Sequence, residues 1–147
     1  MKKIMMTLAL GLTLTTMYAY TGEEAINKNV LNAFKTEFAG ASNAAWSVAD
    51  NYFKVTFAMN DQTLFAYYSK NGDFMGVTRF ISSVQLPLNL QSSLKKSYMN
   101  YWITDLFEMA NHDGTTYYVT LETADCKVVL KSADGSDWAV YKKSKKA

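Results

Sequence analysis

Two similar stretches of sequence, about 60 residues each, are the feature that most limits how this chain can fold. The segment FKVTF at 53–57 matches YYVTL at 117–121, and the turn residues Asn71-Gly72 match Asp134-Gly135 after a slip of one residue. Each stretch opens with a helical pattern and continues with strand patterns. The repetition predicts an α+β protein made of two tandem units, at about 23–81 and 86–142.

The first unit begins with an amphipathic helix, which ends before Gly40. Its apolar residues recur at helical spacing: Ile26, Val30, Leu31, Phe34 and Phe38. Strand patterns follow near Trp46 and then at 53–59, 62–68 and 74–81. Because Asn60-Asp61 is a turn sequence, counting across it predicts that Phe57 pairs with Leu64. Val55 is then expected opposite Ala66.

The second unit repeats this order of a helix followed by four strands. Pro87 suits the start of a helix that carries Leu90, Leu94 and Tyr98 on one side. Four strands are predicted after it, at 101–110, 115–122, 126–132 and 138–141. One helix per unit is too little to cover both faces of four strands. We therefore expect two helix-plus-four-strand units that share one antiparallel sheet, with both helices on one face.

The N-terminus has the pattern of a secretory signal peptide. Lys2 and Lys3 precede an apolar stretch at 4–17, and small residues near Ala19 suit the peptidase, so we place the cleavage after Ala19. The apolar stretch is shorter than the roughly 20 residues of a membrane-spanning helix, and no longer one follows. No cysteine near the junction could carry a lipid anchor. Residues 20–147 are expected to form one exported domain, periplasmic or secreted, with no membrane span.

The distribution of charge argues against nucleic acid as a partner. The formal net charge is +2, but residues 20–141 contain 9 basic and 13 acidic residues, a net of −4. Four lysines crowd the C-terminus, where we expect them to remain solvated: Lys142, Lys143, Lys145 and Lys146. Non-specific nucleic-acid binding needs a basic face in addition to a basic tail.

No residue pattern points to catalysis, a cofactor or a metal. His112 is the only histidine and lies in a polar turn, whereas a zinc site needs three or four clustered ligands. Cys126 is the only cysteine, and its strand parity with Val128 and Leu130 predicts a side chain in the core. The sequences around Asp113 and Asp134 read as hairpin turns and lack the ligand pattern of a calcium loop. The sequence therefore predicts no catalytic, cofactor-binding or metal-binding residues, and no enzyme.

With this order of elements, the sequence resembles the PepSY-like family of exported Bacteroidota proteins. The resemblance covers nearly all of the chain after the signal peptide. It is carried by Val30, Phe34, Phe38 and Trp46 and by the segments 101–105, 114–122, 127–131 and 133–136. It implies a fold similar to the tandem α/β halves of β-lactamase inhibitory protein. Because these residues are aromatics and turn glycines, the resemblance implies an architecture and no particular activity.

The sheet face turned away from the helices is the candidate binding face. Strand parity places ten residues on it: Lys54, Thr56, Phe65, Tyr67, Tyr118, Thr120, Glu122, Lys127, Val129 and Lys131. Exposed rings interleaved with charges are typical of protein interfaces. An antiparallel sheet also often presents Thr, Tyr and Lys to water with no partner at all. Both interpretations stay open at this stage.

Three classes of function are compatible with these residues. The first is an exported binding module that engages another protein of the cell envelope through the open face and restrains it if it is an enzyme. The second is a periplasmic carrier or sensor for a small apolar or envelope-derived ligand held between the helices and the sheet. An enzyme ranks last.

Overall fold

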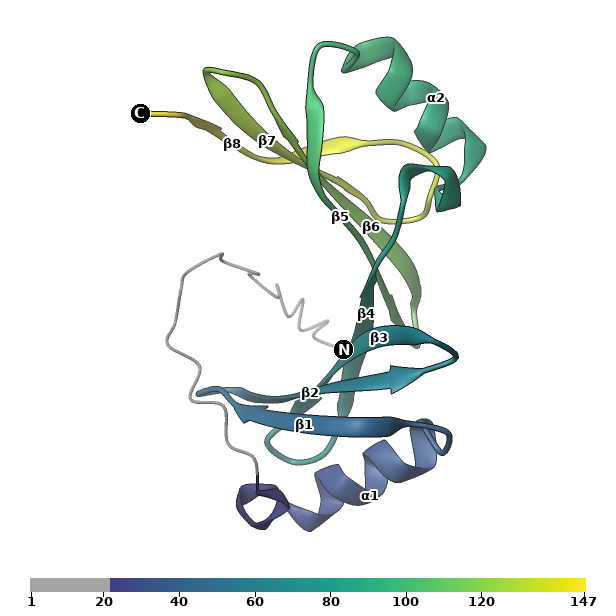
Figure 1. Ribbon diagram of the computed structural model, residues 1–147, viewed down its shortest axis with the longest axis vertical. Helices are drawn as coiled ribbons and strands as arrows, with labels where there is room; N and C mark the ends of the chain where they lie inside the picture. Colours follow the sequence, from purple (N-terminus) through teal and green to yellow (C-terminus); the bar gives the residue numbers. More distant parts are fainter. Residues whose placement is uncertain (1–21) are drawn as a thin grey trace, which may run out of the picture.

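The computed structural model describes residues 22–147, so the predicted signal peptide at 1–19 lies outside the described residues. One open antiparallel sheet of eight strands runs through the molecule, and each strand pairs with the next one along the chain (Figure 1). The strands are β1 (Ser42–Val48), β2 (Tyr52–Met59), β3 (Gln62–Ser69), β4 (Phe74–Phe80), β5 (Trp102–Asn111), β6 (Gly114–Glu122), β7 (Cys126–Ser132) and β8 (Ala139–Lys145).

Two helices of ten residues accompany the sheet, α1 (Lys28–Glu37) and α2 (Leu88–Ser97). A short 3-10 turn precedes each of them, Glu23–Ala25 before α1 and Ser83–Gln85 before α2. The start of each helix is tied to a hairpin turn of its own half. Asn27 donates its amide to the carbonyl of Lys70 at 3.4 Å, and Asn89 donates to the carbonyl of Gly135 at 2.9 Å. None of the helices in 22–147 is long and apolar enough to cross a membrane.

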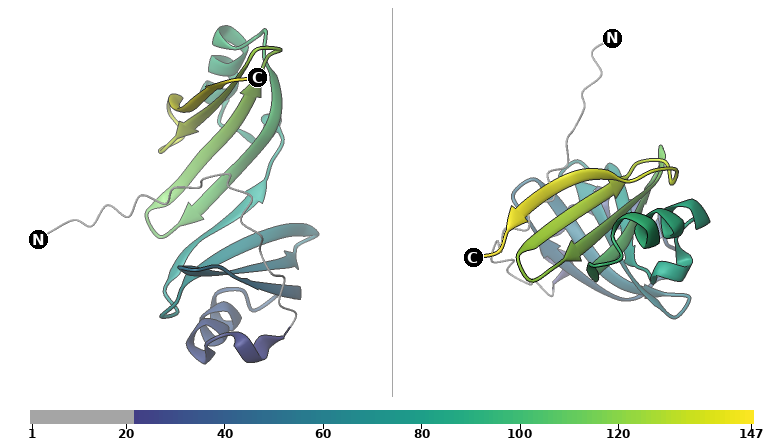
Figure 2. Two further views of the ribbon diagram at one scale, coloured as in Figure 1. Left: turned by 90° about the vertical axis from the view of Figure 1, so that its left-hand side faces the viewer. Right: turned by 90° about the horizontal axis from the view of Figure 1, so that it is seen from above.

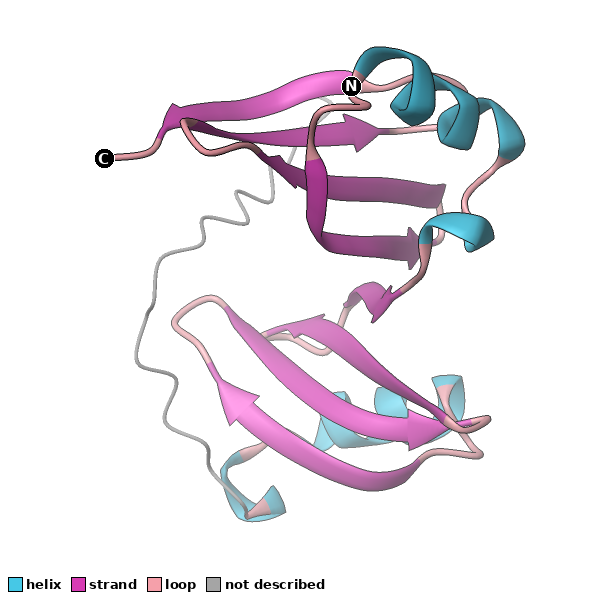
Figure 3. Cartoon of the chain, turned by 45° about the horizontal axis from the view of Figure 1, so that its top comes forward, coloured by secondary structure: helices cyan, strands magenta, loops and turns pink. Residues whose placement is uncertain are grey.

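The strand register agrees with the alternation of apolar residues. Phe57 lies opposite Leu64 and Val55 opposite Ala66, so the predicted pairing across Asn60-Asp61 is confirmed. The β4–β5 pairing joins the two halves of the sheet, with Phe80 opposite Phe107. Figures 2 and 3 show that the sheet twists and curls strongly between the halves, with each helix beside the strands of its own half.

Two apolar cores hold the helices against the sheet. Beneath α1, Val30 and Phe34 pack among buried residues of β1–β3, and beneath α2, Leu90 and Leu94 pack among buried residues of β5–β7. The register shows that both cores lie on the same face. Val77 packs against the α1 core and pairs with Ala110. Leu106, four residues before Ala110 on the same strand, pairs with Val119 of the α2 core.

The last strand is longer than the sequence pattern indicates. A strand was expected at 138–141 with a solvated lysine tail after it, but β8 continues to Lys145, which pairs with Cys126 of β7. The lysine side chains of β8 are exposed, as expected. Backbone pairing with β7 extends the strand although the side chains follow no apolar alternation. Lysines on an edge strand also discourage pairing with other chains.

Candidate functional site

A continuous line of aromatic rings crosses the face opposite the helices. Phe65 of β3 contacts Phe80 of β4 at 5.8 Å between ring centroids, and Phe80 contacts Phe107 of β5 at 6.4 Å. Phe107 stacks on Tyr118 of β6 at 5.0 Å, and Tyr118 meets Tyr141 of β8 edge-on at 5.8 Å. Because alternate residues of paired strands share a face, the pleat brings these rings together.

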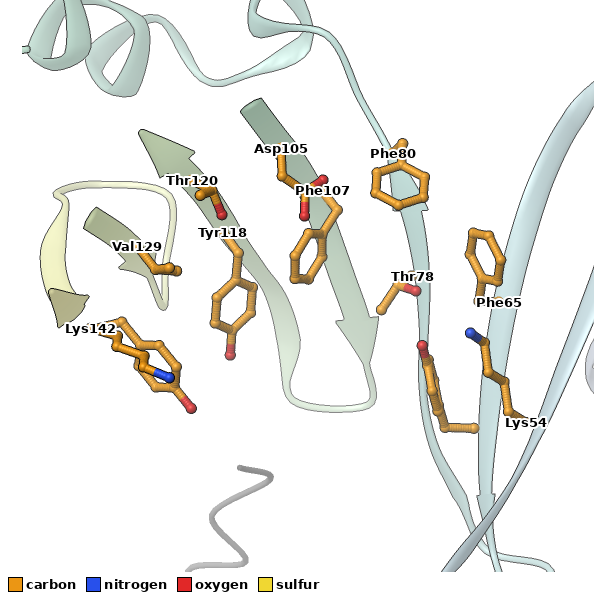
Figure 4. Close-up of a pocket in the computed structure, with 12 residues that line it drawn as sticks. Lys54, Phe65, Thr78, Phe80, Asp105, Phe107, Tyr118, Thr120, Val129 and Lys142 are labelled. Atoms are coloured by element: carbon orange, nitrogen blue, oxygen red, sulfur yellow. The ribbon is translucent and has the colours of Figure 1, made fainter. Parts of the chain in front are cut away.

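The curl of the sheet makes this face hollow. A cavity of about 430 Å³ lies over the rings, and Figure 4 shows its lining. The lining residues come from the strands of both halves: Lys54, Phe65, Tyr67, Thr78, Phe80, Asp105, Phe107, Tyr118, Thr120, Val129, Tyr141 and Lys142. The open face of the sheet therefore carries a hollow that is shared by strands of both halves.

A bulge in β8 supplies one end of this lining. Val129 pairs with Lys142 and Leu130 pairs with Val140, so Tyr141 is an extra residue between the two pairs. A regular strand would send Tyr141 and Lys142 to opposite faces. Because of the bulge, both line the cavity.

The ten residues predicted for the open face do not all reach the cavity. Six of them line it: Lys54, Phe65, Tyr67, Tyr118, Thr120 and Val129. The other four lie outside it, although the register places them on the same face: Thr56, Glu122, Lys127 and Lys131. Lys131 holds its ammonium 5.7 Å from the centroid of the Tyr118 ring. Glu122 forms ion pairs with Lys127 at 3.6 Å and with Lys146 at 2.6 Å.

Sequence reasoning missed six residues of the lining. They are Thr78, Phe80, Asp105, Phe107, Tyr141 and Lys142. Phe107 could have been found, because counting across the turn at 112–113 places it opposite Tyr118. No local sequence signal marks the bulge that turns Tyr141 onto this face.

The expected exposure of the predicted face is wrong for its central residues. Tyr118 is 9% exposed and Thr120 is 5% exposed, so neither presents a free side chain to solvent. Phe107 stacks on the Tyr118 ring, and Tyr141 covers the edge of that ring. The sequence-based count of strand parity included neither Phe107 nor Tyr141. The exposed rings of the line are Phe80, at 65%, and Tyr141, at 40%.

Lys54 is the cation at the β2 side of the cavity. Figure 4 shows its amine directed toward Thr78 and Phe65, and the nitrogen lies 4.8 Å from the Phe65 centroid and 5.9 Å from that of Tyr67. The ion pairs among the described residues involve Arg79, Lys127 and Lys146 as cations, and none involves Lys54. Burial lowers the pKa of Lys54, because the ammonium has lost water without gaining an acid partner.

Asp105 is the acid of the cavity. Burial raises the pKa of its carboxyl, and a backbone hydrogen bond to Leu106 and the charge of Lys127 oppose that rise. The folded protein therefore holds the Asp105 proton more tightly than the unfolded chain does. The stability that this carboxyl contributes is complete below its ordinary pKa of 3.8 and is lost as the pH rises through the higher folded-state pKa.

We expect Asp105→Asn to unfold at a higher temperature than the wild type at pH 7, with the difference vanishing near pH 3. Thermal melts followed by circular dichroism at both pH values measure this. Asp134→Asn is the control of opposite sign, because hydrogen bonds from Ser136 lower the pKa of Asp134. That variant should be less stable at pH 7 only. An Asp105→Asn variant that is less stable than the wild type at pH 7 would contradict the assignment.

His112 and Cys126 are the other residues that the sequence singled out for possible chemistry. Within 22–147 no three His, Cys, Asp or Glu side chains gather as a metal site would require. His112 lies edge-on to Phe74, with ring centroids 5.3 Å apart. Cys126 was expected in the core, but it is only partly buried at the edge of the α2 core. Its sulfur contacts Thr123 Oγ1 at 3.3 Å and Tyr101 Oη at 3.6 Å.

The arrangement is similar to solved structures from Bacteroides. A BLIP-like protein from Bacteroides fragilis has 18% sequence identity and a TM-score of 0.69, over 82% of this chain and 86% of that chain. A DUF2874 family protein from Bacteroides ovatus has 19% identity and a TM-score of 0.72, over 82% and 87%. A protein from Bacteroides eggerthii, provisionally assigned to the periplasm, has 13% identity and a TM-score of 0.69, over 82% and 88%.

These likenesses show the fold. The chain has the fold of BLIP-like and DUF2874 proteins, with one open eight-stranded antiparallel sheet and two helices. No protein-family model matches the sequence, and no curated protein matches it either. The expected α+β architecture, one antiparallel sheet with two helices, is therefore confirmed in its BLIP-like form. The tandem repeat and membership of the PepSY-like family stay predictions.

Proposed function

We propose that this protein is an exported, non-catalytic binding module that engages another protein of the cell envelope through the concave face of its sheet. The observation that carries the proposal is the line of rings from Phe65 to Tyr141, which takes its rings from five strands and ends near lysines. Aromatic rings that combine apolar area with a rigid shape are the residues that most often dominate protein interfaces. The periplasmic assignment of one structural neighbour supports the cellular location.

The accessible rings and charges of the concave face suit a protein partner. Phe80 is 65% exposed at the centre of the sheet, and Trp102 is 51% exposed farther along β5. The cations Lys54 and Lys131 lie over rings of the line. An accessible ring at the centre with charged groups around it matches the anatomy of interfaces, which have an apolar core and a polar rim.

The proposal extends to the kind of protein partner. Because a structural neighbour is named BLIP-like, an extracytoplasmic enzyme is the first partner to test, with restraint of that enzyme as the outcome.

The two halves each contain a 3-10 turn, a ten-residue helix and four strands. We infer that they are tandem repeats, and that duplication created the wide concave face between them.

The test is a crosslinking pull-down from envelope extracts, followed by affinity measurement with each captured protein. We expect Phe80→Ala and Tyr67→Ala to raise the Kd about tenfold or more, because each removes ring area from the face. Leu88→Ala is the matched control, since Leu88 is 79% exposed on α2 and away from this face. Circular dichroism must show that all variants are folded.

Tyr118→Ala is a less clean probe, because the ring is buried against Phe107 and Tyr141 and its loss also disturbs the face itself. If folded Phe80→Ala and Tyr67→Ala variants bind every captured protein as tightly as the wild type, the concave face is not the interface.

A further inference from the structure

The cavity on the concave face has the dimensions of a small-molecule site. Its volume of about 430 Å³ lies within the range of roughly 300–1,000 Å³ that ligand pockets occupy. Rings supply much of the lining, and Thr78 and Thr120 are its buried hydroxyl groups. This hollow is on the open face, whereas the sequence-based alternative placed a small ligand between the helices and the sheet.

Lys54 gives the cavity a charge preference. Its ammonium rests on the faces of Phe65 and Tyr67 and has no acid partner among the described residues. A partly buried cation without a partner loses hydration that an anion in contact with it would replace. The same loss of hydration lowers the pKa of Lys54. An anionic group beside Lys54 would restore the stability of the charged form.

The acid of the cavity lies away from Lys54. Residues that lie opposite one another on successive strands form a row across the sheet. Lys54 is in the row of Tyr67 and Gly76, whereas Asp105 is in the row of Thr120, Val129 and Lys142. The row of Phe65 and Thr78 and the row of Phe80, Phe107 and Tyr118 separate them. A ligand with one anionic end at Lys54 would therefore extend over the rings toward Asp105. Lys142, the cation of the Asp105 row, is exposed, whereas Asp105 is partly buried. A second anion held inside the cavity at that far end would therefore meet the Asp105 carboxyl.

We propose that the cavity binds an amphipathic monocarboxylate, with its carboxylate against the Lys54 ammonium and its apolar body along the rings of Phe65, Phe80 and Phe107. The occupant is a free small molecule, so this proposal is independent of the protein partner proposed above. The rings provide the apolar contact area, and the charge of Lys54 selects a carboxylate over a neutral or cationic head.

Isothermal titration calorimetry with dodecanoate, below its micelle concentration, tests the proposal on the purified protein. We expect saturable binding of one dodecanoate per chain and at least about tenfold weaker binding of dodecyltrimethylammonium, which has the same tail and a cationic head. Lys54→Met should weaken dodecanoate binding about tenfold or more, while Lys54→Arg retains most of it because the charge remains. Lys95→Met on α2 is the matched control and should change nothing.

Amide chemical shifts measured by NMR locate the ligand. Dodecanoate should shift the amides of Phe65, Thr78 and Phe107 and leave those of α1 in place. Equal affinity for the two surfactants, unchanged dodecanoate binding by Lys54→Met, shifts confined to the helix side, or no saturable binding would each overturn the proposal. None of these outcomes bears on the binding of a protein partner, which the affinity measurements with Phe80→Ala test separately.

Discussion

Replacing Phe57 with alanine is expected to lower the free energy of unfolding by about 3–5 kcal/mol. Phe57 is 2% exposed, and its ring lies 5.0 Å from that of Phe34 and 4.8 Å from that of Phe38, measured between centroids. Truncation removes both contacts and leaves a cavity beneath α1. Because Phe34 of α1 also packs on Trp46, at 5.4 Å between centroids, the helix stays in place and neighbouring side chains refill this space only in part.

Urea denaturation followed by circular dichroism measures this loss. Phe80→Ala is the matched control, because the same ring is removed from a site that is 65% exposed, and we expect its effect to stay below about 1 kcal/mol. The two variants therefore compare how much a ring on each face of the sheet contributes to the free energy of unfolding. Equal losses in the two variants would mean that the ring line supports the fold as much as the core does.

The core could be predicted from the sequence because its signal is local. Val55 and Phe57 alternate with polar residues, and the Asn60-Asp61 turn fixes the register of the returning strand. Period-two alternation in β2 and helical spacing in α1 each fix which side chains face inward. The same parity count placed Lys54, Phe65 and Tyr67 correctly on the opposite face.

The site was harder to predict because its shape depends on irregular pairing and on curvature. Tyr141 reaches the cavity through a bulge that depends on the pairing of β8 with β7, and nothing in the segment 139–145 signals it. Parity predicted that Tyr118 lies on the open face, but the count could not show that Phe107 and Tyr141 bury it. Burial on a curled sheet depends on neighbours from several strands, which local patterns do not specify.

β4 leaves the regular ladder at one place, and a bulge of this kind bends a strand and increases its twist. Tyr67 pairs with Gly76 and Tyr68 with Phe74, so Met75 is an extra residue in β4 just before the strand crosses to the second half. Gly76 has a φ of +155°, and a Cβ built on it would lie 2.8 Å from Met109 Cε and 3.2 Å from the carbonyl oxygen of Ala110. The backbone of β5 therefore lies so close to Gly76 that a Cβ at this position would require it to shift by a few tenths of an ångström.

Replacing Gly76 with alanine is accordingly expected to destabilise the fold by about 2–3 kcal/mol, through backbone strain and through displacement of β5 at the Ala110 carbonyl. The Met109 side chain is flexible enough to move, so the contact with backbone determines the cost. Gly40→Ala is the matched control, since its Cβ would meet only Met59 Cε at an ordinary 3.7 Å, and we expect a change within about 0.5 kcal/mol. Urea denaturation of both variants measures the difference.

Because β4 and β5 join the halves of the sheet, Gly76→Ala should also weaken dodecanoate binding in the folded fraction, whereas Gly40→Ala should not. A Gly76→Ala variant as stable as the wild type would show that the β4–β5 junction tolerates a side chain and that the curl of the sheet has another origin.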